Sequence, residues 1–291
     1  RRADACHPGR RQREVWPGTE AGSKHPIGGG REGEVMAKMQ LTFLGTGTSN
    51  GVPVIGCHCA VCDSKDPRDH RLRTAALLET ASTRILIDCG PDIRQQLMPL
   101  PFRKIDAVLL THAHYDHVGG LDDLRPFCRF GDIPMYGNEP CVKAVRHNFP
   151  YCFSEHLYPG VPKIELHTLH KEEALRVGDI DVLPIEVMHD KLSVLGYRFG
   201  SLGYITDMKN IDDNQLALLE GVDTLVVNGL RWEKPHHSHQ LIPDAVAMGQ
   251  RLDARRTFII HVTHDVGLYD QANARLPEGC LFPFDGMKIK V

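Results

Sequence analysis

The stretch Thr111-His112-Ala113-His114-Tyr115-Asp116-His117-Val118-Gly119-Gly120 decides the fold and the chemistry expected of this chain. The apolar residues before it predict a buried strand, and alternation along an extended chain puts His112 and His114 on the same side. Asp116 and His117 follow where the closing glycine pair permits a turn, so they are expected to face a second, adjacent position. Nitrogen and oxygen donors without a thiolate favour a catalytic site for zinc, manganese or iron over a solvated histidine-rich loop.

This stretch resembles the HxHxDH motif of the metallo-β-lactamase fold superfamily of hydrolases. The resemblance implies an α/β (α+β) fold, a four-layer αββα sandwich of two mixed β-sheets with outer helices. It also implies a two-metal site completed by a lone His, an Asp and a final His, each following a different strand. His189, Asp207 and His261 fit that order in this chain. By the resemblance, one metal takes His112, His114 and His189, the other takes Asp116, His117 and His261, and Asp207 bridges them.

A second group of potential metal ligands lies nearer the N-terminus. It consists of three thiols in CxCxxC spacing: Cys57, Cys59 and Cys62. They are one short of the four ligands of a tetrahedral structural zinc, and the residues alone leave His58 and His264 open as the fourth. Residues 44–59 resemble the start of PhnP-type phosphodiesterases, which carry a Cys3His zinc, and this favours His264. Such a zinc would pin the N-terminal loop to the loop of His261.

Supporting roles are expected for several other residues. Asp88 ends an apolar strand, as in the first motif of the superfamily, where this residue braces the metal loop without binding metal. Arg125 and Arg198 lie in segments similar to the PhnP-type branch and are candidates for binding phosphate. Arginines of this kind more often pair with neighbouring acids.

The segment 235–245 contains three more histidines ahead of an amphipathic helix. The His-x5-Ala pattern of PhnP-type and tRNA 3'-processing relatives falls on His239, a position that contacts the substrate phosphate in those proteins. The resemblance therefore implies that His239 acts in catalysis, together with Asp116 and Asp207. His236 and His237 are then expected to be loop residues.

The composition of the chain limits the kinds of partner that are expected. The chain of 291 residues has 42% hydrophobic content, a net charge of -3 and no Lys/Arg-rich run outside its N-terminal segment, which argues against a nucleic-acid partner. Nine cysteines without a disulfide-like framework predict reduced thiols and a cytoplasmic location. No run of 18 apolar residues occurs, so no membrane partner is expected. Dimers are common among such relatives, but no feature here demands a homodimer.

The chain is expected to consist of a disordered extension, residues 1–38, and one hydrolase domain, residues 39–291. The extension is rich in Arg, Gly, Pro and Glu, and Met36 or Met39 would be the natural start. A proline-rich span, 129–178, resembles the family least and would carry substrate choice. The patterns predict strands at 41–44, 75–79, 84–88, 105–110, 163–169, 181–188, 194–199, 203–206, 223–227 and 257–260, and helices at 92–98, 121–127, 212–220 and 244–252.

These observations predict a metal-dependent hydrolase, with a small-molecule phosphodiester as its partner. The PhnP-type resemblance implies a phosphodiesterase acting on small cyclic phosphodiesters such as phosphoribosyl 1,2-cyclic phosphate. Two divalent ions, zinc or manganese or else iron, would lower the pKa of a shared water and hold the phosphate oxygens, and one zinc would be structural. The alternatives are another hydrolase of the superfamily, namely a tRNA 3'-end endonuclease, lactonase or thioesterase, and a non-catalytic zinc-stabilised binding protein.

Overall fold

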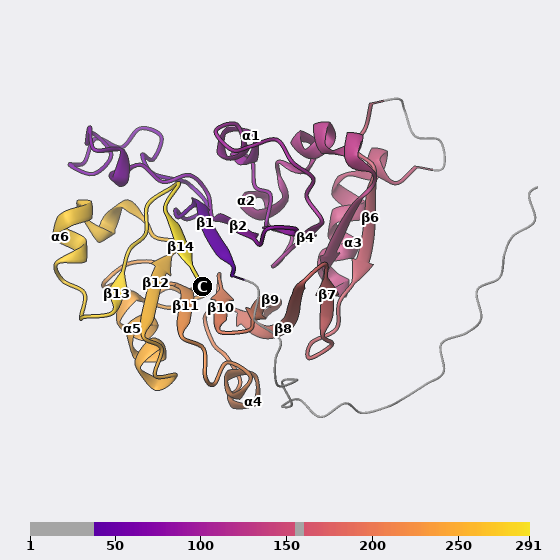
Figure 1. Ribbon diagram of the computed structural model, residues 1–291. Coiled ribbons are helices and arrows are strands. Elements are labelled where there is room, and N and C mark those ends of the chain that lie inside the picture. Colours follow the sequence, from indigo (N-terminus) through magenta and orange to yellow (C-terminus); the bar gives the residue numbers. More distant parts are fainter. Residues whose placement is uncertain (1–37, 155–159) are drawn as a thin grey trace, which may run out of the picture. The chain divides into compact units, whose positions relative to one another are not determined.

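Two β-sheets packed face to face form the core of the computed structural model, which describes residues 38–154 and 160–291 (Figure 1). The first sheet has seven strands in the order β14-β1-β2-β3-β4-β5-β6. Their bounds are β1 (Gln40–Gly45), β2 (Ala75–Glu79), β3 (Arg84–Ile87), β4 (Ala107–Leu109), β5 (Ile133–Gly137), β6 (Ile164–Thr168) and β14 (Lys288–Lys290).

The second sheet also has seven strands, in the order β13-β12-β11-β10-β9-β8-β7. Both sheets are mixed, because antiparallel neighbours on one side give way to parallel neighbours on the other. The bounds in the second sheet are β7 (Leu175–Val177), β8 (Ile180–His189), β9 (Leu192–Phe199), β10 (Leu202–Ile205), β11 (Thr224–Asn228), β12 (Arg256–Ile260) and β13 (Cys280–Leu281).

Short helices cover the outer faces of the sheets. In Figure 1, α1, α2 and α3 lie along the outer face of the first sheet, and α4 and α5 lie along the outer face of the second. The α-helices are α1 (Ile93–Leu97), α2 (Tyr115–Val118), α3 (Glu139–Asn148), α4 (Asp213–Ala217), α5 (Ile242–Arg251) and α6 (Tyr269–Asn273). The 3-10 helices are η1 (Pro67–Asp69), η2 (Leu121–Phe130), η3 (Pro150–Cys152) and η4 (His264–Val266).

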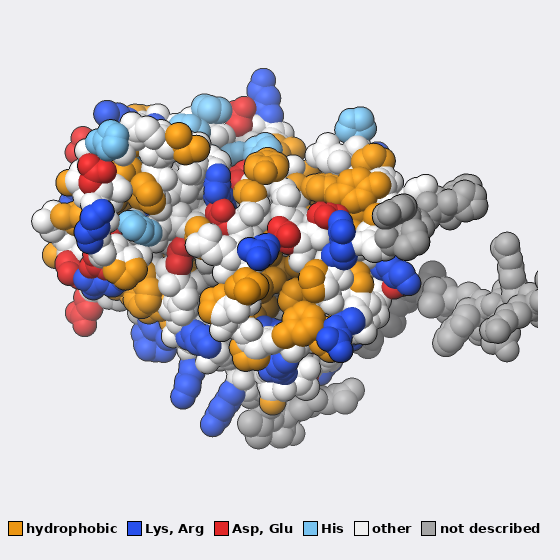
Figure 2. All heavy atoms as spheres, turned by 90° about the horizontal axis from the view of Figure 1, so that it is seen from above, with side chains coloured by type: hydrophobic (Ala, Val, Ile, Leu, Met, Phe, Trp, Pro, Cys, Tyr) orange, Lys and Arg blue, Asp and Glu red, His pale blue; other side chains and the backbone are white. Residues whose placement is uncertain are grey.

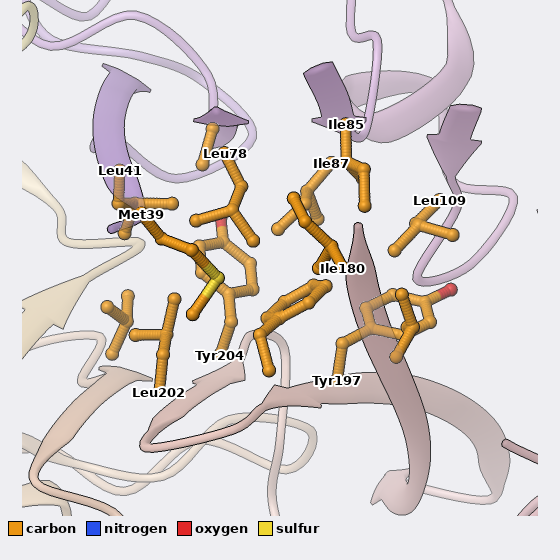
Figure 3. Close-up of a cluster of buried hydrophobic side chains, with 14 of the residues drawn as sticks. Met39, Leu41, Leu78, Ile85, Ile87, Leu109, Ile180, Tyr197, Leu202 and Tyr204 are labelled. Carbon is orange, nitrogen blue, oxygen red and sulfur yellow. The ribbon is translucent and has the colours of Figure 1, made fainter. Parts of the chain in front are cut away.

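Alternation along the strands builds three apolar layers. In β3, Ile85 and Ile87 point between the sheets, whereas Leu86 packs under the helices of the first sheet. Figure 3 shows the central layer, where Leu41 and Leu78 of the first sheet face Leu202 and Tyr204 of the second. Burying one such side chain stabilises a fold by roughly 1.5 to 3 kcal/mol. The layers confirm the predicted αββα sandwich.

The proline-rich span 129–178, where the patterns predicted a strand at 163–169, contains further regular elements. The structure has β5 and α3 there. Asn138 caps α3 by accepting the Cys141 N–H at 3.0 Å, and Pro140 stands in the first turn, where its missing N–H costs no hydrogen bond. Pro140 therefore helps to start a helix within this span. The predicted strand at 105–110 is also shorter, since β4 keeps only Ala107–Leu109.

Apart from Lys38, the segment expected to be a disordered extension lies outside the described residues. Among the residues that are described, every helix is too short or too polar to cross a lipid bilayer.

Candidate metal centre

Side chains expected to bind metal, and the bracing residue Asp88, lie at or close behind strand ends. Asp88 comes directly after β3, and His112 comes three residues after the end of β4. His189 is the last residue of β8, and His261 directly follows β12. Because β3 and β4 are parallel, and β10 to β12 are parallel, their carboxyl ends gather at common edges of the sheets. This is where open α/β sheets usually bind ligands.

One group of three histidines lies at the first position. Potential ligand atoms of His112, His114 and His189 lie within 4.8 Å of one another. His112 Nε2 is 2.8 Å from His114 Nδ1, so these two nitrogens share one small space. The other nitrogen of His189, Nδ1, lies 2.9 Å from the Ser238 carbonyl oxygen, which can only accept a hydrogen bond. His189 therefore keeps the proton on Nδ1 and leaves the Nε2 lone pair available to a metal.

A second group of four residues is fully buried. It consists of Asp116, His117, Asp207 and His261, again with potential ligand atoms within 4.8 Å of one another. Asp207 Oδ1 lies 3.4 Å from His117 Nε2 and 3.2 Å from His261 Nε2. Its other oxygen, Oδ2, lies 3.8 Å from His112 Nε2 of the first group. The two oxygens of one carboxylate therefore face the two groups, which is the arrangement that a bridging ligand requires.

Unpaired polar atoms in this cluster fit metal ions. Among the described residues, His117 Nε2 and His261 Nε2 are buried and make no hydrogen bond, although Asp207 Oδ1 lies within 3.4 Å of both. Burial works against a charge on His117, but Asp207, Asp88 and Asp116 outweigh it and raise the pKa of the imidazole. Burying polar nitrogens without partners is costly. A divalent ion between these nitrogens and the carboxylates would remove that cost, so the residues present fit a dinuclear metal site.

Asp88 lies behind this cluster, where bracing was expected. It accepts hydrogen bonds from the Thr111 N–H at 2.8 Å and the Thr111 hydroxyl at 2.9 Å. His117 Nδ1 lies 2.7 Å from Asp88 Oδ2, which holds the proton on Nδ1 and points Nε2 into the cluster. Thr111 was not singled out in the sequence, because a threonine after an apolar strand carries no distinguishing signal.

The backbone is strained at the same places. Asp88, Asp207 and His261 have φ values of 61°, 54° and 56°, which non-glycine residues adopt at a cost of about 1 to 3 kcal/mol each. Close packing adds a further constraint, since a Cβ on Gly90 would lie 1.9 Å from the Asp116 carbonyl oxygen. Strain and close packing of this kind concentrate at functional sites.

His239 faces the metal cluster. Its Nε2 lies 3.2 Å from Asp207 Oδ2, and burial lowers the pKa of this imidazole to about 4 despite the carboxylate. His236, expected to be a loop residue, lies close behind, with its Nδ1 3.1 Å from His239 Nδ1. No sequence pattern distinguished His236 from its neighbour His237. The backbone carbonyl of Ser238, which binds His189, was likewise invisible in the sequence.

The three cysteines of the CxCxxC element lie around His264, and they are called the thiol group below. The sulfur atoms of Cys57, Cys59 and Cys62 each lie 3.3 Å from His264 Nδ1. The His58 side chain is 84% exposed and lies beside Asp63, outside this group. The Cys62 N–H lowers the pKa of Cys59 to about 6, whereas burial raises that of Cys62 to about 11. A bound metal would take all three sulfurs as thiolates, and the Cys3His arrangement fits a structural metal.

The two arginines considered for phosphate binding have other contacts. Arg125 pairs with Asp122, and Arg198 donates to the carbonyl oxygens of Gly200 at 2.9 Å and Leu218 at 2.5 Å. Within the described part of the chain, their hydrogen bonds do not involve the metal cluster. A phosphate-binding role for them stays a prediction.

Comparisons with known proteins agree with this geometry. Residues 83–262 match the family described as Beta-lactamase superfamily domain. A crystal structure of a new diphosphatase from the PhnP family superposes with a TM-score of 0.81 and 38% sequence identity, over 87% of this chain and 97% of that one. Zinc-bound PqqB from Methylobacterium extorquens superposes with a TM-score of 0.72 over 87% of this chain and 100% of that one, and at 20% identity it shares the fold alone.

One curated relative is longer. An octanoyltransferase of Porphyromonas gingivalis is 40% identical over 251 residues, which are 86% of this chain and 51% of the relative. The chain thus spans about half the length of that protein. The name of that relative, octanoyltransferase, therefore assigns no activity to this chain.

Proposed function

Because the chain belongs to the metallo-β-lactamase superfamily, we propose that its buried cluster of histidines and aspartates hydrolyses small cyclic phosphodiesters of the phosphoribosyl 1,2-cyclic phosphate type. The observation that carries the proposal is the combination of this cluster with a Cys3His group. Lactonases and thioesterases of the superfamily normally lack the CxCxxC element. The proposal therefore specifies a bond between phosphorus and oxygen, rather than a lactone or thioester bond.

The residues that would hold the ions follow from the two groups. His112, His114 and His189 would bind one ion, Asp116, His117 and His261 would bind the other, and Asp207 would contact both. Divalent ions bound there would supply a hydroxide at neutral pH and neutralise the charge of the phosphate under attack. The ligand chemistry is compatible with zinc, manganese and iron alike.

The chain itself supplies orientation and a proton. His239 Nε2 faces the cluster beside Asp207, within reach of a phosphate placed over the ions. We assign it the role of donating a hydrogen bond to the charge that develops on the phosphate, or of giving a proton to the leaving oxygen as the bond to phosphorus breaks. The second role requires the imidazolium form, which keeps the Nδ1 proton after Nε2 has given up its own. General acid catalysis of this kind contributes typically 10²- to 10⁴-fold. Asp88 would keep His117 in the orientation that binds metal.

A second substrate class is favoured by one comparison. The PhnP-family structure at 38% identity is described as a diphosphatase. A diphosphate also presents a substituted phosphoryl group to the site, so the same residues could bind it. Hydrolysis of a diphosphate is therefore the second candidate function.

Partners and location stay proposals. Figure 2 shows basic side chains scattered among acidic and hydrophobic ones on one face, which supports a small-molecule substrate over a nucleic acid. The eight cysteines in the described ranges are all free, which supports a cytoplasmic location. A homodimer stays a prediction.

The test is a substrate panel with metal-reconstituted protein. It should include a cyclic ribose phosphate, a generic aryl phosphodiester, a diphosphate, a short RNA, a lactone and a thioester. Asp207→Ala, purified in parallel, controls for contaminating hydrolases. We expect the cyclic phosphodiester to show the highest kcat/KM. Preference for the diphosphate would favour the second candidate, and hydrolysis of the lactone or thioester alone would overturn both.

A further inference from the structure

Strand β11 ends in a buried asparagine, between two strands that lead to proposed metal ligands. Asn228 is the last residue of β11, and the neighbours of β11 in the second sheet are β10 and β12 (Figure 1). Asp207 comes two residues after the end of β10, and His261 comes directly after β12. Asn228 has no exposed surface, so its side-chain amide needs hydrogen-bond partners inside the protein.

Both partners of this amide belong to the backbone of Met208, the residue after Asp207. The Met208 N–H donates to Asn228 Oδ1 at 2.8 Å, and Asn228 Nδ2 donates to the Met208 carbonyl oxygen at 2.9 Å. The side chain thus pairs with one residue through both of its polar groups, in the way that a residue of an antiparallel strand would. Because one partner is a donor and the other an acceptor, the amide has a single orientation.

The pairing with Met208 holds a strained part of the chain. Asp207 has a φ of 54°, a left-handed conformation that a non-glycine residue keeps only when the surrounding structure imposes it. The Thr206 hydroxyl donates to Asp207 Oδ1 at 2.8 Å. The direction of the carboxylate therefore follows once the backbone on either side of Asp207 is held.

The Met208 carbonyl oxygen also joins the loop of Asp207 to the loop of His239. It accepts a second hydrogen bond from the Gln240 N–H at 3.0 Å, and Gln240 Nε2 donates to the Asn228 carbonyl oxygen at 2.8 Å. Gln240 is the residue after His239. Both loops are therefore attached to the same end of β11.

We propose that Asn228 is a positioning residue for the metal pair, because its contact with Met208 holds Asp207 in the conformation in which its two carboxylate oxygens face both groups of ligands. Without this contact, Asp207 can relax to a right-handed or extended conformation, and its carboxylate turns away from one group. Asn228 itself contacts no ion and no substrate. The proposal rests on the part of the proposed function that assigns Asp207 to both ions, and it does not depend on which substrate is hydrolysed.

The experiment measures the binding of Mn²⁺ to the full chain after a mild chelator has emptied the buried cluster. Asn228→Leu removes both hydrogen bonds at a similar size, and Asn228→Ala removes them without crowding. Thr224→Val is the matched control, because Thr224 is a buried polar residue at the other end of β11 whose hydroxyl contacts Asp223 and Arg256. EPR spectroscopy measures free Mn²⁺ and distinguishes a magnetically coupled pair of ions from isolated ions. Competition with a chelator measures the affinity for Zn²⁺ in the same proteins.

We expect both Asn228 variants to bind the second ion about 10- to 100-fold more weakly than the parent, which is the range for losing an outer partner of a metal ligand. The EPR signal of the coupled pair should give way to that of isolated ions, because a turned carboxylate no longer contacts both positions. The metal of the thiol group should stay bound, and Thr224→Val should match the parent. A merely structural role would lower the unfolding temperature and leave the metal affinity of the folded protein unchanged.

The outcomes separate this inference from the assignment beneath it. If the buried cluster of the parent takes up neither two Mn²⁺ nor two Zn²⁺ ions, or if Asp207→Ala binds them as the parent does, the metal assignment fails. If Asp207→Ala loses the pair but a folded Asn228 variant keeps the affinity for the second ion within about twofold, only the role of Asn228 fails.

A variant that does not fold is recognised by circular dichroism. If this happens to Asn228→Leu, Asn228→Ala decides by the same criteria. Failure of both variants to fold would overturn the proposal in favour of a structural role, and so would an equal loss of metal affinity in Thr224→Val.

Discussion

The two candidate metal groups of this protein differ in what holds their ligands in place. The histidine and aspartate cluster lies at the ends of strands from two sheets, and hydrogen bonds that His117 and His189 donate to Asp88 and to the Ser238 carbonyl already orient these imidazoles. The thiol group lies in loops, where a small apolar cluster of Val52, Val61 and Cys62 is the main packing beneath it.

The difference shows two uses of a metal site. The buried cluster takes its geometry from the sheets, so we expect it to survive largely intact when its ions are removed. The thiol group has little else to fix its loops, so its metal would supply the order. His261 and His264 are three residues apart, and the second group therefore affects the first through one short segment.

The largest effect should come from breaking the buried cluster at its shared ligand. Asp207→Ala should lower kcat/KM roughly 1,000-fold or more, because the ions supply several kcal/mol of charge stabilisation and this carboxylate faces both groups. Steady-state assays and a metal count measure the effect. Asp213→Ala, at an exposed aspartate on α4, is the control and should behave like the parent. An active Asp207→Ala protein with two ions bound would contradict the assignment.

Removing a ligand from the thiol group should mainly lower the stability of the fold. His264→Ala should lower the free energy of unfolding by roughly 2 to 4 kcal/mol, because loss of a metal ligand is among the few causes of large effects. His58→Ala should stay within about 0.5 kcal/mol, since that exposed side chain lies outside the group. Denaturant unfolding with a metal count checks both variants. Loss of the metal in His58→Ala, with retention in His264→Ala, would reverse the choice between them.

A smaller loss of activity is expected when the residue that orients the buried cluster from behind is changed. Asp88→Asn keeps the shape but replaces an acceptor that serves His117 and Thr111, so activity at fixed metal concentration should fall about 10- to 100-fold. Asp106→Asn, at a carboxylate outside the cluster, is the matched control. Metal titration should show weaker binding, and unchanged affinity with unchanged activity would refute the bracing role.

The smallest effect concerns the thiols after metal removal. In the metal-free molecules whose loops keep the Cys59–Cys62 contact, Cys59, with a pKa lowered to about 6 mainly by the Cys62 N–H, is largely thiolate at pH 7 and about one-tenth thiolate at pH 5. Alkylation of Cys59 by iodoacetamide should therefore slow about tenfold between these pH values. Cys62, whose pKa burial raises to about 11, should react little at either pH. Peptide mass spectrometry identifies the modified residue, and faster reaction at Cys62 would contradict this order.

Much of the fold and the cluster could be predicted from the sequence, because strand alternation and the HxHxDH spacing are local signals. The residues that set proton positions could not be predicted in the same way. Ser238 acts through its backbone carbonyl, which every residue has, and Thr111 acts through a contact with Asp88 that exists only after folding. The helix α3 was not predicted either, because its start depends on the Asn138 cap and on Pro140 in the first turn.

The contact between Cys57 and His264 also has a topological consequence. These residues are 207 positions apart, and every other member of the proposed metal sites lies between them. With a metal bound there, the chain between these residues forms a closed ring. The unfolded state then loses conformational entropy, as it does when a long-range disulfide closes a loop. This loss stabilises the folded state by about 4 to 5 kcal/mol for a loop of 100 residues or more. A single protease cut inside the ring would leave two fragments that remain joined.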